Sequence, residues 1–454
     1  MFSTILIANR GEIALRVART CRELGIRTVA VHSTVDADSA VVRFADEAVQ
    51  IGPPAAKRSY LNVPAVVEAA LRTGAEAIHP GYGFLSEDAD FAEVCADHGI
   101  TFIGPPPAVM AKLADKADAR AFMADAGLPV LPGTRGTVRT VADVREAAAR
   151  IGYPLIIKAA AGGGGRGMAV VRDPQELVSA YRETQAHALA VFGDGSVYLE
   201  RYLDSARHVE VQVLADSHGN AVHLGERDCS VQRRHQKLVE ETPAPGLSEE
   251  LTEQMGQAAV RGALAAGYVG AGTFEFLVDG SGSYYFMEIN CRIQVEHPVT
   301  EMVTGVDLVR EQIRVAQGLP LGFGQEAVQR RGWSVECRIN AEDPARGFVP
   351  TPGMLEEFSM PAGPFTRVDT HGFPGWRVSP HYDSLLAKVV VWGPDRDAAL
   401  ARMDRALSEV RVRGPHMHTT AGFLAEVLAH PMFRDGKHST ALVDQMLSAG
   451  TGDA

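Results

Sequence analysis

The stretch from Glu288 to His297 alternates between polar and apolar side chains over almost its whole length. Alternation with a period of two is the pattern of a β-strand, and it places the polar side chains on one face. That face would carry two acids, an arginine and two carboxamides, at positions 288, 290, 292, 294 and 296. Because a solvated strand face more commonly carries Lys, Thr and Ser, this set indicates a site for a metal ion and an anion.

Residues 273–277 and 284–288 are also typical of strands, and the Asp-Gly-Ser-Gly sequence between them is typical of a turn. Centring this hairpin on residues 281 and 282 pairs Glu275 with Glu288, with their Cβ atoms about 5 Å apart. Like charges at that separation repel each other, and a divalent cation such as Mg²⁺ would remove the penalty. Two alternatives stay open: the acids splay apart into solvent, or a β-bulge shifts the register.

Residues 1–112 alternate short apolar strands with helices, which predicts a parallel sheet and an α/β fold. The turn at residues 9–12 does not match the GxGxxG pattern, so it does not indicate dinucleotide binding. Tyr82 stands in a glycine-rich turn directly after a strand, where ligands are often contacted. An aromatic side chain that covers the core is the equally open alternative.

A run of glycines separates two predicted strands at residues 155–158 and 168–171. It formally satisfies GxGxxG at residues 162–167, but the dinucleotide interpretation is rejected because no helix follows. The run also lacks the Gly-Lys-Ser/Thr of a Walker loop. A glycine-rich loop between strands can close over nucleotide phosphates, and Lys158 on the preceding strand would reach them. The alternative is a flexible linker.

Residues 226–237 are dense in charge and include Lys237, one of only seven lysines in the chain. A surface loop would explain such a segment, but its Arg, His and Lys side chains also fit an anion site.

Glu200, on the predicted strand 197–203, is a candidate partner for an adenine amine or a ribose hydroxyl. A strand over 335–340 places Glu336 and Arg338 on one face. We expect residues 397–430 to be helical and the chain from Ser448 onward to be frayed.

The composition is that of an ordinary globular enzyme. The chain has 454 residues, 46% hydrophobic and 22% charged, which is enough for two to four domains. Its net charge of −12 argues against nucleic acid or a membrane surface as a general partner. The sequence has no apolar run of membrane-spanning length, and because the first residues lack a basic region we expect no signal peptide. Five dispersed cysteines without a CxxC pair indicate neither zinc nor disulfides, so we expect a cytoplasmic protein.

Together these segments closely resemble the biotin carboxylase family, in particular the biotin carboxylase component of bacterial acetyl-CoA carboxylase, an ATP-grasp enzyme. The resemblance rests on Lys158 with the loop 162–167, and on segments 7–13, 79–86, 226–237, 272–276 and 288–298. It covers residues 2–445. It implies an N-terminal Rossmann-like domain (1–113), an ATP-grasp domain (114–325, with a mobile lid at about 131–203) and a C-terminal α+β domain (333–446).

The resemblance also implies roles for individual residues. The positions for ATP are Lys116, Lys158, Gly164, Gly165, Glu200, Arg201, Leu203, His208, Gln232, His235, Glu275 and Glu288. The positions for Mg²⁺ or Mn²⁺ are Glu275, Glu288 and Asn290. The positions for bicarbonate and catalysis are Lys237, Arg292, Gln294, Val295 and Glu296, and those for biotin are Tyr82 and Arg338. Three residues depart from the family pattern: Arg201 for Lys, Cys291 for Thr and His381 for Tyr.

The implied reaction uses ATP to activate bicarbonate as carboxyphosphate and then carboxylates biotin. Because the chain contains no Met-Lys-Met sequence, we expect biotin to arrive as a substrate on a separate carrier protein. The other implied partners are carboxyltransferase subunits and a second copy of the chain. Alternatives are the same module of another acyl-CoA, pyruvate or urea carboxylase, another bicarbonate-activating ATP-grasp ligase, and a catalytically inactive binding subunit.

Overall fold

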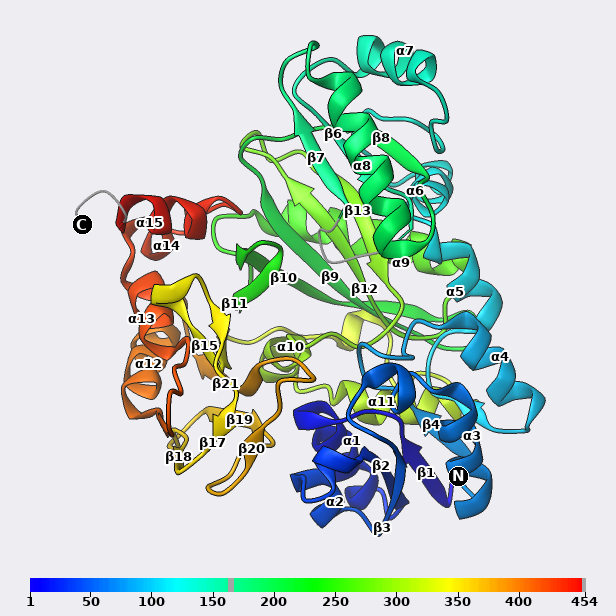
Figure 1. Cartoon of the computed structure of the whole chain (residues 1–454), viewed down its shortest axis with the longest axis vertical. Helices are drawn as coiled ribbons and strands as arrows, with labels where there is room; N and C mark the ends of the chain where they lie inside the picture. The colour runs from blue at the N-terminus through cyan, green and yellow to red at the C-terminus, as the bar shows by residue number, and fades with distance from the viewer. Residues whose placement is uncertain (162–166, 451–454) are drawn as a thin grey trace.

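The computed structural model describes residues 1–161 and 167–450. The N-terminal part forms a five-stranded sheet in the order β3-β2-β1-β4-β5, and every pairing is parallel, as the strand–helix alternation predicts. Its elements are β1 (Thr4–Ile7), α1 (Gly11–Glu23), β2 (Arg27–Ser33), α2 (Ala40–Phe44), β3 (Glu47–Gly52), α3 (Val63–Thr73), β4 (Ala77–His79), α4 (Ala89–Asp97) and β5 (Thr101–Phe102). This part lies at the lower right of Figure 1, in blue.

Two helices then lead to a small separate sheet. Asp115 accepts hydrogen bonds from the backbone N–H groups of residues 117 and 118, which begins the second of these helices at Lys116. The elements are α5 (Pro107–Ala114), α6 (Lys116–Asp125), α7 (Val141–Ile151), β6 (Leu155–Ala159), β7 (Met168–Val171), α8 (Leu177–Phe192) and β8 (Val197–Arg201). Strands β7-β6-β8 are antiparallel, with α7 and α8 packed on them at the top of Figure 1. Residues 162–166, four glycines and Arg166 of the predicted phosphate loop, lie outside the described residues.

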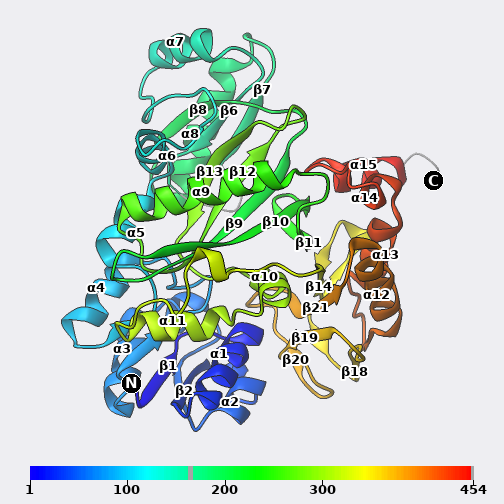
Figure 2. The same cartoon turned by 180° about the vertical axis from the view of Figure 1, so that it is seen from behind.

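An antiparallel sheet of eight strands occupies the centre, in the order β13-β12-β9-β10-β11-β14-β21-β19. Its strands are β9 (Arg207–Ala215), β10 (Ala221–Arg233), β11 (Gln236–Thr242), β12 (Gly270–Val278), β13 (Tyr284–Asn290), β14 (Trp333–Asn340), β19 (Thr366–Thr370) and β21 (Leu385–Gly393). Helix α9 (Glu249–Ala266) packs against β9 and β10, as Figure 2 shows from behind. Because β11 pairs with β14, this one sheet joins the middle of the chain to its C-terminal part.

The β12–β13 hairpin has the predicted pairing of Glu275 with Glu288, and Met287 forms a bulge directly beside it. The prediction of one strand through to His297 is wrong, because β13 ends at Asn290. The next backbone N–H, that of Cys291, donates to the Glu87 carboxylate at 2.9 Å instead of continuing the ladder. A loop then leads to two helices, α10 (His297–Thr304) and α11 (Leu308–Ala316).

The C-terminal part packs helices on the far end of the central sheet. Its helices are α12 (Arg396–Glu409), α13 (Ala421–Ala429), α14 (Pro431–Arg434) and α15 (Leu442–Gly450). Its short strands are β15 (Glu342–Asp343), β16 (Val349–Pro350), β17 (Gly353–Met354), β18 (Glu357–Ser359), β20 (Arg377–Val378) and β22 (Arg411–Arg413).

Two predictions for this part are wrong. The helix expected over 397–430 is interrupted because β22 pairs with β18 and a Gly-Pro sequence follows it. Residues 448–450, which were expected to be frayed, belong to α15. Residues 451–454 lie outside the described part. Across residues 1–161 and 167–450, none of the helices combines the length and the apolar character needed to cross a membrane.

Candidate active site

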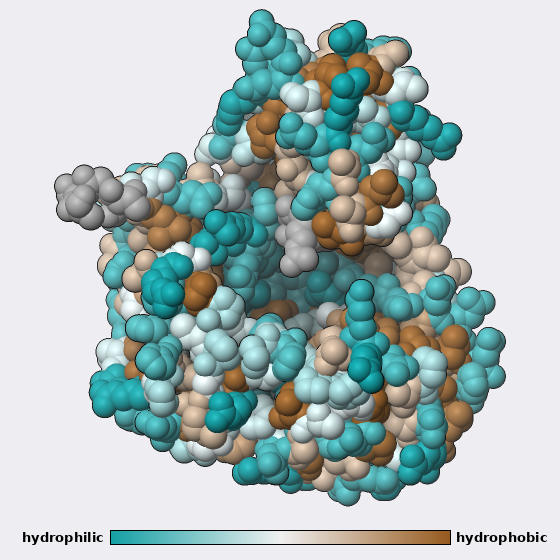
Figure 3. Space-filling model, in the orientation of Figure 1, coloured by the Kyte–Doolittle hydropathy of each residue, from teal (hydrophilic) through white to brown (hydrophobic). Residues whose placement is uncertain are grey.

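A cleft of about 490 Å³ opens between the small sheet, the central sheet and the segment before α15. The hollow in the middle of Figure 3 is lined mainly by hydrophilic residues. The predicted residues that line it are Lys116, Lys158, Glu200, Arg201, Leu203, His208, Gln232, His235, Lys237, Glu275, Glu288, Asn290, Arg292, Gln294, Val295, Glu296 and Arg338. Gly164 and Gly165 fall outside the described residues, and Tyr82 does not line this cleft.

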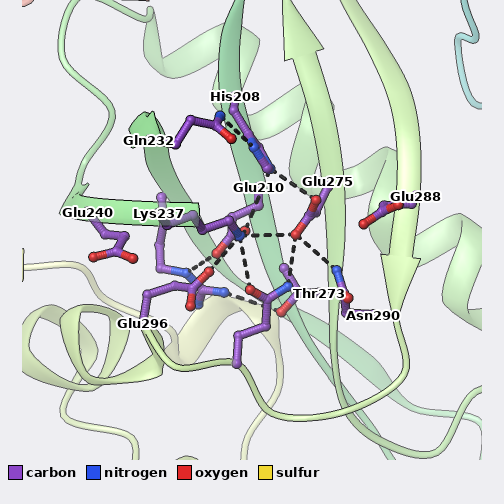
Figure 4. A network of polar contacts seen from close by, with 12 residues as sticks. His208, Glu210, Gln232, Lys237, Glu240, Thr273, Glu275, Glu288, Asn290 and Glu296 are labelled. Atoms are coloured by element: carbon purple, nitrogen blue, oxygen red, sulfur yellow. Dashed lines mark hydrogen bonds and ion pairs between the residues drawn. The ribbon is translucent and has the colours of Figure 1, made fainter. Parts of the chain in front are cut away.

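Lys237 is the centre of the polar network in this cleft (Figure 4). Its Nζ lies 2.6 Å from both Glu210 and Glu296 and 3.0 Å from both Glu275 and Gln294. Three buried carboxylates therefore share one ammonium group, and although burial opposes its charge, they raise the pKa of Lys237 well above its usual value. The charge-dense segment is thus no surface loop: it forms β10 and β11 and turns its lysine inward.

The two acids of the hairpin have different cation partners. Glu275 accepts hydrogen bonds from Asn290 Nδ2 at 2.9 Å and Gln294 Nε2 at 3.0 Å, and it lies 3.1 Å from His208 Nε2. Burial would raise the pKa of Glu275, but Lys237 and His208 outweigh it and hold that pKa well below its usual value. Glu288 forms an ion pair with Lys116, so this lysine offsets the repulsion predicted between the two acids.

The hairpin residues fit a hard divalent cation. Glu275, Glu288 and Asn290 present carboxylate and amide oxygens to one cleft, which is the donor set that Mg²⁺ prefers. A neighbouring group of His208, Glu210 and Glu275 also brings ligand atoms within 4.8 Å of one another. The Lys237 ammonium, however, already lies between Glu210 and Glu275, so that second group is occupied by a cation of the protein itself.

Arg292 has a partner that the sequence did not reveal. Its Nε lies 3.0 Å from Glu87, and its Nη2 donates to Asn290 Oδ1 at 3.1 Å. Glu87 belongs to the loop that precedes α4, in the N-terminal part, and it also accepts the backbone N–H of Cys291. This carboxylate therefore fixes the start of the loop that carries Arg292, Gln294 and the residues after them. The Cys291 side chain is buried away from the cleft, as expected from the alternation.

Arg338 joins the C-terminal part to the Lys237 network. Its Nε donates to Glu240 at 2.7 Å, and its Nη2 lies 3.0 Å from Glu296. Burial would raise the pKa of Glu296, but Lys237 and Arg338 hold it well below its usual value, so this carboxylate is ionised. The central sheet thus places Arg338 where it donates a hydrogen bond directly to Glu296, although the two residues are 42 positions apart in the sequence.

Tyr82 lies behind this network. Its hydroxyl donates to Glu12, which lies 3.1 Å from Lys388 Nζ, and that ammonium donates to the Val295 carbonyl at 2.8 Å. A buried chain of polar contacts therefore connects the N-terminal sheet, the C-terminal part and the loop before α10. Neither Glu12 nor Lys388 was predicted, because nothing in their local sequence shows that they are buried.

At the other end of the cleft, Glu200 forms ion pairs with two cations. Its carboxylate lies 2.6 Å from Lys158 Nζ and 3.0 Å from Arg120 Nε. The Arg201 side chain instead donates a hydrogen bond to the carbonyl of Ile151, the last residue of α7, at 3.2 Å. His381, another departure, is exposed beside Tyr382.

The turn between β10 and β11 aims His235 into this end of the cleft. Arg234 and His235 both have positive φ, which a two-residue hairpin turn of this kind requires. Further along β10, Gln232 Nε2 lies 3.4 Å from His208 Nδ1. The hairpin thus presents polar side chains to the same end of the cleft as Leu203.

Arg227 is the buried counterpart of the cleft acids and was also missed. Its guanidinium is fully buried and contacts Glu210 at 2.6 Å, Gln212 at 2.8 Å and Thr300 at 3.0 Å. The signal was present in the charged segment 226–237, but sequence alone could not say which of its cations face the core and which face the cleft.

Comparison with known proteins agrees with this arrangement. Residues 1–110 match the family profile "Biotin carboxylase, N-terminal domain", and residues 336–445 match "Biotin carboxylase C-terminal domain". Residues 115–323 match "Carbamoyl-phosphate synthase L chain, ATP binding domain". The chain is 55% identical to a biotin carboxylase of Nostoc over 98% of this chain and 99% of that protein. It is 53% identical to biotin carboxylase 1 of Bacillus subtilis over 98% of both chains.

Solved structures agree as well. The biotin carboxylase domain dimer of 2-oxoglutarate carboxylase from Hydrogenobacter thermophilus, in complex with MgADP, ADP and bicarbonate, superposes with a TM-score of 0.95 at 47% identity, covering 98% of each chain. Biotin carboxylase from Campylobacter jejuni, in a β,γ-ATP complex, superposes with a TM-score of 0.96 at 46% identity, covering 98% of this chain and 99% of that one. With these identities over nearly its full length, this chain belongs to the biotin carboxylase family of ATP-grasp enzymes.

Proposed function

We propose that this chain carboxylates biotin on a carrier protein, using bicarbonate and ATP and releasing ADP and phosphate. The observation that carries the proposal is the Lys237 network, in which Glu296 lies between the ammonium of Lys237 and the guanidinium of Arg338. One side of this network faces the lysines suited to phosphates, and the other side faces Arg338. A site with that order can activate an anion at one end and pass it to an acceptor at the other.

In the first half-reaction, a bicarbonate oxygen attacks the γ-phosphorus of ATP, the bond to ADP breaks, and carboxyphosphate forms. Arg292 offers a planar fork of donors to bicarbonate, with Lys237, Gln294 and the Val295 backbone beside it. Glu296 is kept ionised by its two cations, so it can accept the bicarbonate proton as the new P–O bond forms.

The nucleotide end works mainly by positioning and electrostatics, as phosphoryl transfer requires. Lys116 and Lys158 would bind phosphate oxygens, and both now pair with carboxylates that nucleotide binding would release. Glu275, Glu288 and Asn290 would hold Mg²⁺ or Mn²⁺, which when bound supplies positive charge to the phosphates. His208, His235, Leu203 and the neighbouring backbone would complete the pocket for the nucleoside.

In the second half-reaction, biotin N1′ attacks the carboxyl carbon of carboxyphosphate, the C–O bond to phosphate breaks, and the departing phosphate takes up the N1′ proton. Arg338 would stabilise the enolate oxygen that develops on the ureido ring. Tyr82, linked to the loop before α10 through Glu12 and Lys388, would help to shape this end of the site. The placement of Arg338 on β14 supports a role in this step, because the strand reaches the network from the C-terminal part.

We further propose that the chain acts as a homodimer and serves the first half-reaction of acetyl-CoA carboxylase, with a biotin carboxyl carrier protein and carboxyltransferase subunits as partners. The proposed domains are residues 1–113, 114–325 and 333–446. Likeness to a domain of 2-oxoglutarate carboxylase supports the view that the final acceptor is selected by another subunit. Carboxylation of a different acceptor by the parent complex is therefore the second candidate.

The test is ADP release by the purified chain with ATP and Mg²⁺. We expect it to depend on bicarbonate and to rise sharply when free biotin is added, with carboxybiotin formed in step with the additional ADP. If ADP release did not depend on bicarbonate, or if ammonia or an amine stimulated it and biotin did not, the chain would be assigned to another ATP-grasp reaction.

A further inference from the structure

Two buried acids, Glu240 and Glu336, take no part in the reaction described above. They lie directly opposite each other on β11 and β14, so their side chains share one face with Cβ atoms about 5 Å apart. Their exposed fractions are 1% and 0%. Two carboxylates so close and so deeply buried would repel each other strongly if both were ionised.

Their hydrogen bonding is incomplete. Glu240 Oε1 accepts from Arg338 Nε at 2.7 Å, but among the described residues Glu240 Oε2 and both oxygens of Glu336 have no hydrogen-bond partner. An ionised carboxylate offers only acceptors, whereas a protonated one has a donor. A proton on Glu336 would therefore give this pair a donor, with Glu240 Oε2 as the acceptor directly across the ladder.

The charges that face the pair favour the same arrangement. Those groups are Lys237 on β11, Arg338 on β14, Lys388 on β21 and Glu296 before α10, together with the thiols of Cys229 and Cys337. Both lysines are already engaged, Lys237 by three carboxylates and Lys388 by Glu12 and the Val295 carbonyl. Within residues 1–161 and 167–450, Arg338 is the one cation that hydrogen-bonds the pair, and it is shared with Glu296.

We propose that Glu336 keeps its proton at neutral pH, and that Glu240 carries the single negative charge which holds the Arg338 guanidinium beside Glu296. The pair is then a positioning device for Arg338. Burial raises the pKa of Glu240 to about 7. Burial, together with the nearby charge of Glu240, raises the pKa of Glu336 well above its usual value. Because Glu240 becomes protonated as the pH falls below neutrality, its attraction for the Arg338 guanidinium weakens there. The catalytic consequence rests on the activity proposed above, whereas the protonation itself does not.

Infrared spectroscopy tests the proton directly, without any turnover. In heavy water at neutral pH, we expect the wild-type protein to show the carbonyl band of a buried protonated carboxyl group, and Glu336→Gln to lack it. Glu356→Gln, which changes an exposed acid, should keep the band. If the variant fails to fold, the infrared spectrum of the wild type alone tests the proposal. The absence of any protonated-carboxyl band at neutral pH overturns it.

The positioning role is tested by pH–rate profiles of Glu240→Gln and the wild type. The ionised fraction of Glu240 rises about tenfold between about pH 6 and about pH 8 for a pKa of about 7. The ratio of wild-type to variant rate of biotin carboxylation should rise over this range, by at most the same factor, while the ratio for biotin-independent ATP cleavage stays constant. A constant ratio for carboxylation would overturn the positioning role. Absence of bicarbonate-dependent ATP cleavage in the wild type would instead contradict the proposed function and leave the infrared result standing.

Discussion

Replacement of Lys237 by methionine should destabilise the central part of the protein substantially. The ammonium group contacts Glu210, Glu275 and Glu296, whose side chains are at most 6% exposed. Removing one partner of a buried ion pair costs about 3–5 kcal/mol, because the remaining charge stays buried. Each of the three acids keeps at least one other basic partner, namely Arg227, His208 or Arg338. The low end of that range, about 3 kcal/mol, therefore applies here.

That loss translates into a measurable shift in melting temperature. For a unit of 150–250 residues, about 3 kcal/mol corresponds to a lowering of roughly 6–12 °C. The assay is calorimetry of the nucleotide-free and metal-free protein, with Lys437→Met as the control, since Lys437 is 69% exposed and pairs only with Asp435 among the described residues. If Lys237→Met melted within about 2 °C of the control, the three contacts would not be the buried ion pairs inferred here.

Three further predictions concern the cleft. Glu275→Gln and Glu288→Gln should each lower turnover by roughly 10²-fold or more, with partial recovery at raised Mg²⁺ or with Mn²⁺; full activity at low Mg²⁺ would refute the assignment to metal binding. Glu87→Gln should raise KM for bicarbonate more than KM for ATP, because it loosens Arg292; an equal change in both constants would show only a general disturbance. Lys158→Met should weaken ATP binding in direct titration, and unchanged affinity would remove this lysine from the nucleotide site.

Local sequence patterns were sufficient for the N-terminal parallel sheet and for the β12–β13 hairpin. Strand–helix alternation predicted the parallel sheet of the N-terminal part, and the alternation around residues 273–290 predicted the pairing of Glu275 with Glu288. The same pattern failed beyond Asn290, because the Cys291 N–H is bonded by Glu87, which lies 204 residues earlier in the chain. A periodicity carries no information about such a distant partner.

The buried partners were missed for the same physical reason. Glu87, Glu210 and Arg227 reach the site only after strands from separate parts of the chain pair with one another. Glu87 and Arg227 stand in charge-rich segments, and Glu210 alternates with valines along β9; both patterns fit a solvated surface equally well. The helix predicted over 397–430 failed because the pairing of β22 with β18 is again a contact between distant segments.

The division of labour between Arg338 and Glu296 tests the proposed mechanism most directly, because the two side chains lie only 3.0 Å apart. The measurement is bicarbonate-dependent ATP cleavage, with and without biotin, by Arg338→Ala and Glu296→Ala. Arg338→Ala should lose roughly 10²–10³-fold in biotin carboxylation and keep the slow cleavage that needs no biotin. Glu296→Ala should lose both activities, since carboxyphosphate would not form. Equal loss of the biotin-independent cleavage in the two variants would contradict the assignment of Arg338 to biotin and Glu296 to bicarbonate.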